Sequence, residues 1–164
     1  MKLIAVSALA ALSALSVGAQ TAPPLPDQYV ALGVSLNPGA APPVQGDVEW
    51  GKLATGNTYL GMAAGIIPTT QGAFSLTTAQ AVARQVAWQS ASGRVALVVD
   101  GKIGIANSGN GNTGGAFTGA GGAVIGLHSF GSGKLSAYVG VKAAKTSLQP
   151  NSFGPAVGLV FTPK

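Results

Sequence analysis

The sequence contains no cysteine, so no disulfide can stabilise the chain. Charged residues make up only 8% of it, whereas they are about a quarter of a typical soluble domain. Hydrophobic residues reach 47%, which leaves too few charges to build an ordinary water-exposed surface. Stability must therefore come from the burial of apolar side chains or from a membrane.

Groups for catalysis are equally scarce. The one histidine, His128, has no acid near it in the sequence that could orient its ring, although Ser129 and Ser136 are close. Hydrolysis by a serine needs a nucleophile, a base and an orienting group together. We therefore expect no catalytic residue, and we expect that the protein is not an enzyme. His128 falls on the inward-facing side of its expected strand and is interpreted as a filling or interfacial side chain.

Metal and cofactor motifs are missing as well. Asp47 and Glu49 share a strand face, but no histidine or cysteine joins them, so they could at most hold a hard cation together with water. The glycine-rich segment 109–123 lacks the ending of a P-loop and does not lead into a helix. We expect no cofactor and no metal. Relief of crowding and curvature of a closing sheet explain Gly119, Gly121 and Gly122.

The formal net charge is +5, but the basic residues are scattered and form no run. Such dilute charge does not indicate a nucleic-acid partner. An anionic lipid surface is the weaker remaining possibility.

The first nineteen residues contain one lysine, then an apolar run, then Val17-Gly18-Ala19. This pattern predicts a secretory signal peptide, 1–19, with cleavage after Ala19. A membrane anchor is the alternative, but serine and glycine interrupt the run and no stop-transfer charges follow. Removing 19 of the 164 residues leaves 145, enough for one domain. Residues 20–27 form a proline-rich lead-in that we expect to be unstructured.

After the signal, apolar residues alternate with small or polar ones, and no segment has a convincing helical period. In 28–36, for example, Val30, Leu32, Val34 and Leu36 share one face. Alternation predicts eight strands near 28–36, 47–53, 58–66, 82–90, 94–107, 115–130, 134–143 and 153–161. The barrel domain is therefore expected to span 28–164.

The segment 94–107 contains Asp100-Gly101, a strong signal for a two-residue hairpin. However, the apolar residues on both sides keep one parity, so a single strand presents one continuous apolar face. A hairpin would give two strands of about six residues, short of the roughly 9 to 11 that cross a bilayer. We favour the single strand, with Asp100 and Lys102 facing the interior.

With one strand there, the connections alternate in length. Those at 37–46, 68–80, 107–115 and 146–152 are longer, whereas those at 55–57, 90–93 and 130–133 are tight. Short turns at one end and longer loops at the other are typical of an up-and-down transmembrane barrel. The sequence therefore predicts an all-β fold, an eight-stranded antiparallel up-and-down transmembrane β-barrel.

This pattern of signal peptide, alternating strands and unequal loops resembles the small outer-membrane β-barrel family, the eight-stranded porin-like or OmpA-transmembrane-like class. The resemblance covers the mature chain and implies a monomer in the outer membrane of a Gram-negative cell envelope, with membrane lipid as its partner. Two features depart from the family: the chain ends in Lys164 rather than an aromatic residue, and aromatics are only 6%. Those on the outward parity are Trp50, Trp88, Phe117, Phe153 and Phe161.

An eight-stranded barrel has an interior just wide enough for side chains. Charges there must be paired or hydrated, and three acids with two lysines can form a network that plugs it. The expected polar network consists of Asp47, Glu49, Gln85, Gln89, Asp100, Lys102, Tyr138 and Lys142.

These observations favour a structural or surface-interaction barrel. Two alternatives stay open: a narrow channel or small-ligand carrier in the same membrane, and a soluble secreted β-sandwich or small barrel that acts as a binding module. The strands of the soluble rival would alternate in the same way.

Overall fold

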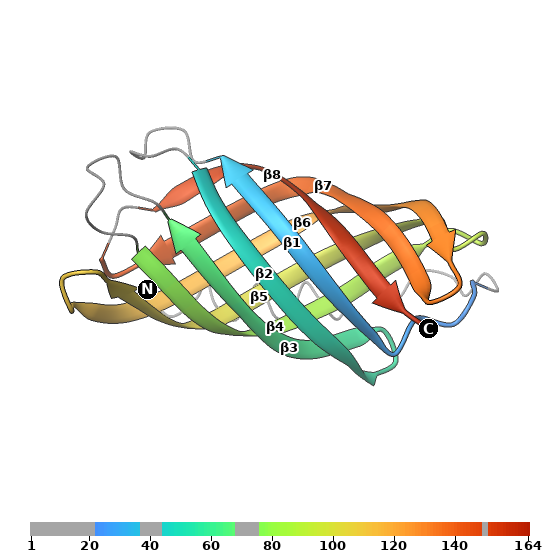
Figure 1. Cartoon of the computed structure of the whole chain (residues 1–164), viewed down its shortest axis with the longest axis horizontal. Helices are drawn as coiled ribbons and strands as arrows, with labels where there is room; N and C mark the ends of the chain where they lie inside the picture. Colours follow the sequence, from blue (N-terminus) through green and yellow to red (C-terminus); the bar gives the residue numbers. More distant parts are fainter. Residues whose placement is uncertain (1–21, 37–43, 68–75, 149–150) are drawn as a thin grey trace.

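The computed structural model describes residues 22–36, 44–67, 76–148 and 151–164. The eight strands in these ranges are β1 (Gln28–Leu36), β2 (Val44–Thr55), β3 (Thr58–Ile67), β4 (Leu76–Gln89), β5 (Val95–Ser108), β6 (Thr113–Phe130), β7 (Gly133–Thr146) and β8 (Ser152–Pro163). Each strand is antiparallel to its neighbours, and β8 pairs with β1, so the sheet closes into a barrel (Figure 1). The expected eight-stranded antiparallel barrel is confirmed. The alternative fold, a β-sandwich of two sheets, is wrong. The described ranges contain no helix long and apolar enough to span a membrane.

Asp100-Gly101 lies in the middle of β5 and not at a turn. Asp100 pairs with Arg84 on one side and Ala120 on the other, and the β5–β6 register runs without a break from Val95 to Asn107. Asp100 and Lys102 are buried, whereas Ile103 and Ile105 are exposed. The single-strand interpretation is confirmed, because one parity holds along the whole element.

The two ends of the barrel differ. The short turns β2–β3, β4–β5 and β6–β7 share one end with the C-terminus, at the right in Figure 1. Two of these turns hold a glycine with positive φ, Gly56 at 52° and Gly93 at 64°, a conformation that glycine adopts without steric cost. The other end carries the longer connections, of which 37–43, 68–75 and 149–150 lie outside the described residues.

Large apolar side chains cover the outside of the barrel. Leu32, Met62 and Phe153 are 55%, 67% and 66% exposed, and all eight strands contribute similar residues. The interior instead holds charged, polar and small side chains together with a few aromatics. This distribution is the reverse of a water-soluble domain, whose exposed surface is mixed and charged.

Two strands begin earlier than the sequence indicated. β4 starts at Leu76 and β2 at Val44, in segments expected to be loops. Thr78 and Gln80 of β4 are buried inside the barrel, so this polar stretch is a strand whose polar face points inward.

The proline-rich lead-in also differs from expectation. Residues 22–27 lie at the short-turn end, where Leu25 packs against the buried cluster around Tyr59. Tyr59 donates a hydrogen bond to the Pro26 carbonyl at 2.8 Å, and the Leu53 amide donates to the Asp27 carbonyl at 2.7 Å. The described part of the lead-in is thus anchored to the barrel, because it satisfies donors at the strand ends. The signal peptide 1–19, its cleavage site and residues 20–21 lie outside the described residues.

Inward-facing glycines make room for large neighbours. A Cβ at Gly51 would lie 2.5 Å from the ring of Tyr29, and one at Gly122 would lie 2.9 Å from the ring of Tyr138. Gly119, in contrast, faces open space and Gly121 has only an ordinary contact. Relief of crowding therefore explains Gly122, but it does not explain Gly119 or Gly121.

Candidate functional site

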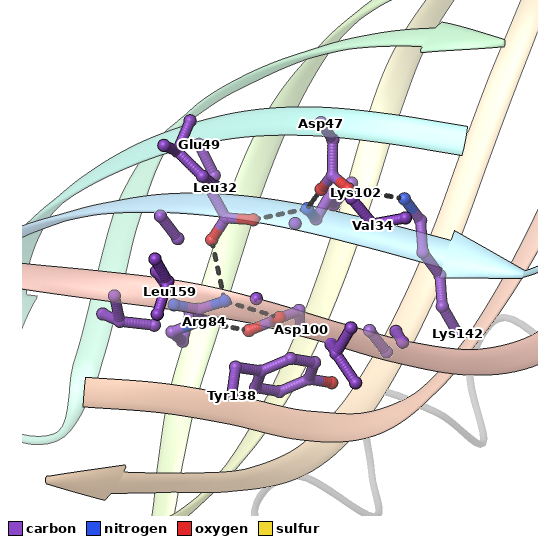
Figure 2. A pocket seen from close by; sticks show the side chains of 17 residues that line it. Leu32, Val34, Asp47, Glu49, Arg84, Asp100, Lys102, Tyr138, Lys142 and Leu159 are labelled. Atoms are coloured by element: carbon purple, nitrogen blue, oxygen red, sulfur yellow. Dashed lines mark hydrogen bonds and ion pairs between the residues drawn. The ribbon is translucent and has the colours of Figure 1, made fainter. Parts of the chain in front are cut away.

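Charged side chains from four strands meet inside the barrel (Figure 2). β2 and β5 supply the acids, and β4, β5 and β7 supply the bases. We call these residues the ion-pair cluster: Asp47, Glu49, Arg84, Asp100, Lys102 and Lys142. Three carboxylates face three cations, so the cluster has no formal net charge.

The two lysines connect strands that are not neighbours in the sheet. Lys102 Nζ lies 3.1 Å from Asp47 Oδ2 and also pairs with Glu49. Lys142 Nζ lies 3.2 Å from the other Asp47 oxygen, Oδ1. Because β2 borders neither β5 nor β7, these ion pairs cross the interior and link opposite walls.

Arg84 forms the second half of the cluster. Its Nε and Nη2 donate to the two oxygens of Asp100 at 2.6 and 2.8 Å, a bidentate pair, and Nη2 lies 3.2 Å from Glu49 Oε1. The guanidinium carbon also lies 4.3 Å from the centre of the Tyr29 ring, within cation–π range. Tyr29 donates its hydroxyl to Glu49. The guanidinium of Arg84 thus has carboxylate partners along its edge and an aromatic ring against one face.

The ion-pair cluster fills the middle of the interior. Asp47 has the most exposed side chain, at 16%, and the other five are 7% exposed or less. The space left around the cluster is about 40 Å³, which holds only a few water molecules. Charges removed from water and joined by several ion pairs do not separate readily. The arrangement therefore closes the barrel to solutes at this level.

Seven of the eight residues expected in the polar network line the interior or its end. Asp47, Glu49, Asp100, Lys102, Tyr138 and Lys142 surround the small cavity at the cluster, and Gln89 lines a separate cavity near the short turns. Gln85 does not belong to this set. It lies opposite Val99 on the outward face, and its neighbour Arg84 takes the inward position.

A β-bulge explains this error. The β4–β5 register shifts between Val86 and Trp88, so Val86 is buried while Trp88 is exposed, although the two are separated by one residue. Extending the outward parity of Trp88 backwards through the bulge gave Gln85 the inward position that Arg84 occupies in the structure. Residues upstream could have indicated that Arg84 points inward. Thr78 and Gln80 lie on the same strand face as Arg84, and they are too polar to face lipid.

Further polar residues on the loop side of the ion-pair cluster were not expected. Gln80 Nε2 donates to Thr118 Oγ1 at 3.2 Å, linking β4 to β6. Ser35 and Gln45, opposite each other on β1 and β2, are also buried. On the loop side, the interior therefore combines these polar side chains with a small apolar cluster of Leu76, Ala106 and Ala116.

His128 is not an interior residue. A second register shift, between Gly126 and His128, places it opposite Leu135, and the exposed imidazole packs at 4.6 Å against the Phe130 ring. The inward assignment of His128 was wrong because the bulge inverts the parity. No group of three histidine, cysteine or acidic side chains that could hold a metal occurs within the described ranges. Asp47 and Glu49 instead have cationic side chains as partners.

Comparison with known proteins supports the fold. No family model and no curated protein sequence matches the chain. Among solved structures, the N-terminal β-barrel domain of OprF from Pseudomonas aeruginosa is similar, with a TM-score of 0.54 and 10% sequence identity over 82% of this chain and 95% of that domain. The protein thus has the fold of that domain, a closed antiparallel barrel that consists here of eight strands.

Proposed function

We propose that the protein is an exported outer-membrane barrel that does not conduct ions and acts as a structural or surface-interaction component, not as an enzyme. The observation that carries this proposal is the ion-pair cluster, whose charge-balanced side chains leave about 40 Å³ of free space at their level of the barrel. An aqueous channel needs a continuous wet path, and such paths belong to barrels of more strands.

The outer surface supports a membrane location. The strands contain 9 to 18 residues, enough to cross a bilayer when tilted. Exposed leucine, isoleucine, valine and aromatic side chains cover them, and in water this area would be an aggregation hazard. A lipid environment removes that cost. The fold similarity to the OprF barrel domain points in the same direction.

Two measurements test the proposal. Folded protein in lipid vesicles should run at a different apparent size in SDS before and after boiling, as closed membrane barrels usually do. In a planar bilayer the same protein should produce no stepwise conductance. Regular current steps would instead favour the narrow channel, and a mature chain that stays monomeric in buffer without detergent would favour the soluble binding module.

A matched variant makes the conductance test sharper. Replacing Arg84, Lys102 and Lys142 together by alanine removes the cations that bridge the walls, so any current seen only in this variant would identify the ion-pair cluster as the block. Replacing the outward Lys52 and Lys145 by alanine is the control, because neither is part of the cluster.

A further inference from the structure

A second cavity lies inside the short-turn end of the barrel, separated from the long loops by the ion-pair cluster. Its volume is about 670 Å³, within the roughly 300 to 1,000 Å³ usual for small-molecule sites. Arg84 is the member of the ion-pair cluster that lines it, together with Ser92 and Gly93 of the β4–β5 turn and Gly133 at the start of β7.

The inner walls of this cavity are apolar. Tyr29 and Tyr59 meet edge to face with ring centres 5.2 Å apart, and Val86, Val98 and Val160 complete the same buried cluster. Water in such surroundings finds few hydrogen-bond partners. An apolar chain would replace that water favourably.

The lead-in provides one side of the mouth. Pro23 to Pro26 line the cavity, and the hydrogen bonds at the Pro26 and Asp27 carbonyls fasten this segment to β3 and β2. The cavity is therefore a chamber with an anchored wall and not simply the open end of a barrel.

Lys134 gives the cavity a specific charge. Its Nζ donates to the Gly93 carbonyl at 2.6 Å, and no carboxylate lies within ion-pair distance in the part of the chain that the structure describes. The other inward-facing cations, Arg84, Lys102 and Lys142, all have carboxylate partners. An ammonium group has three donors, so Lys134 retains donors for an anion.

The mouth contains two more charged groups, Asp27 and Lys164, which are both exposed. Both remain in contact with water, whereas Lys134 is half-buried, so among the described residues at this end it is the cation that lies within the interior without a carboxylate partner. A ligand that complements the apolar walls and the Lys134 ammonium group thus combines an apolar body with one negative charge.

We propose that this chamber binds a single-chain amphiphile with one anionic head, its chain between the tyrosines and valines and its head at Lys134. This inference rests on the barrel of the proposed function but not on the absence of conductance. It adds a ligand site to a protein otherwise treated as a structural component.

Cysteine protection can measure this binding, because the chain has no cysteine of its own. Ala96→Cys places a thiol on the chamber wall, and Asn110→Cys places one in the β5–β6 connection at the opposite end. Each variant is folded in lipid vesicles and treated with a water-soluble maleimide at increasing concentrations of decanoate. Decanol and decyltrimethylammonium, with the same chain length, test the charge of the head.

Decanoate at ten times its dissociation constant should slow labelling at position 96 about tenfold, since only about one chamber in eleven is then empty. Decanol should protect more weakly and decyltrimethylammonium least. Lys134→Met should weaken decanoate binding about ten- to a hundredfold, as expected for loss of a hydrogen bond to a charged group. Lys134→Arg should retain it, and Lys145→Met, on the outside, should not change it.

Several results would overturn the proposal. These are labelling at position 96 that decanoate does not slow in a saturable way, equal protection by the cationic amphiphile, and protection unaffected by Lys134→Met. Equal slowing at position 110 would mean that decanoate acts on the membrane and would also reject the site. The boiling shift identifies variants that fail to form the barrel, and conductance is recorded separately, so failure of the ligand site is distinguishable from failure of the proposed function.

Discussion

Arg84 on β4 and Asp100 on β5 lie directly opposite each other in the sheet, and the guanidinium holds both carboxylate oxygens at 2.6 and 2.8 Å. The pair is almost completely buried. Because the two residues are cross-strand partners, their ion pair fixes the register of β4 against β5 as well as the parity of both strands.

Arg84→Met should lower the free energy of unfolding by about 3 to 5 kcal/mol, because it leaves Asp100 buried without its partner and removes one cation from Glu49. Urea titration in vesicles, followed by the boiling shift, measures this. Adding Asp100→Leu should recover part of the loss, since the uncompensated charge then disappears. The outward Lys52→Met is the control and should stay within about 0.5 kcal/mol of the parent. If Arg84→Met lowers the free energy of unfolding by no more than the control Lys52→Met does, water must hydrate this side of the interior.

Lys142→Met should cost less, about 1 to 3 kcal/mol. Asp47 keeps Lys102 as a partner, and its side chain is the most exposed of the ion-pair cluster. The same titration should therefore rank Arg84→Met as more damaging than Lys142→Met, and Lys142→Met as more damaging than Lys52→Met. Reversal of the first two would contradict the burial difference on which the ranking rests.

Gly51→Ala should destabilise the barrel by about 1 to 3 kcal/mol, the usual cost of overpacking. The added methyl would lie 2.5 Å from the Tyr29 ring. That ring cannot easily retreat, because its hydroxyl binds Glu49 and its face contacts Arg84. Gly119→Ala is the matched control: it meets open space and should be neutral or slightly stabilising. Equal effects of the two variants on the unfolding midpoint would show that Tyr29 does not occupy this position.

The two tryptophans should report lipid contact without any added label. Trp50 and Trp88 are 42% and 43% exposed on the outer surface, and Trp88 is nearer the short turns. Lipids brominated on their acyl chains should quench both. Trp50→Phe, which leaves Trp88, should be quenched best by bromine near the head groups, whereas Trp88→Phe should respond to deeper bromine. Absence of quenching in both variants would place the apolar surface outside the bilayer.

Export predicts a defined new N-terminus. Cleavage after Ala19 gives a mature chain that begins at Gln20, and intact-mass measurement of protein from the membrane fraction checks this. Replacing Ala19 by a large residue such as arginine should block processing. Protein that keeps Met1 in the outer-membrane fraction would contradict the signal peptide.

Local alternation was sufficient for most of the fold. Val95 to Ile105 keep one parity through Asp100-Gly101, and this identified the long strand β5 and with it the strand count. The same reasoning failed for Arg84 and His128, because a bulge adds one residue to a strand and inverts every assignment beyond it. Single-sequence alternation contains no marker for such an insertion.

The sequence predicted less well which side chains pair across the interior. The sequence indicated that Lys142 would be within reach of Asp47 or Glu49, and the structure confirms Asp47. The Arg84 contacts and the anchoring of the lead-in at Tyr59 depend on barrel curvature and strand stagger, which alternation does not determine. The cavity at the short-turn end likewise depends on how the barrel closes, which the sequence alone does not determine.

The ion pairs that cross the interior also constrain how the protein can fold. Asp47 and Lys142 are 95 residues apart in sequence, and Asp47 and Lys102 are 55 apart. Such contacts cannot form in a growing hairpin; they require β2 to approach β5 and β7, which are not its neighbours in the sheet. Loop-closure entropy opposes this step before the contacts can compensate for it, so folding is expected to be slow and strongly cooperative. An incomplete sheet can form the Arg84–Asp100 pair between β4 and β5, but it would leave charges that pair across the interior unsatisfied. The ion-pair cluster thereby destabilises partly assembled barrels.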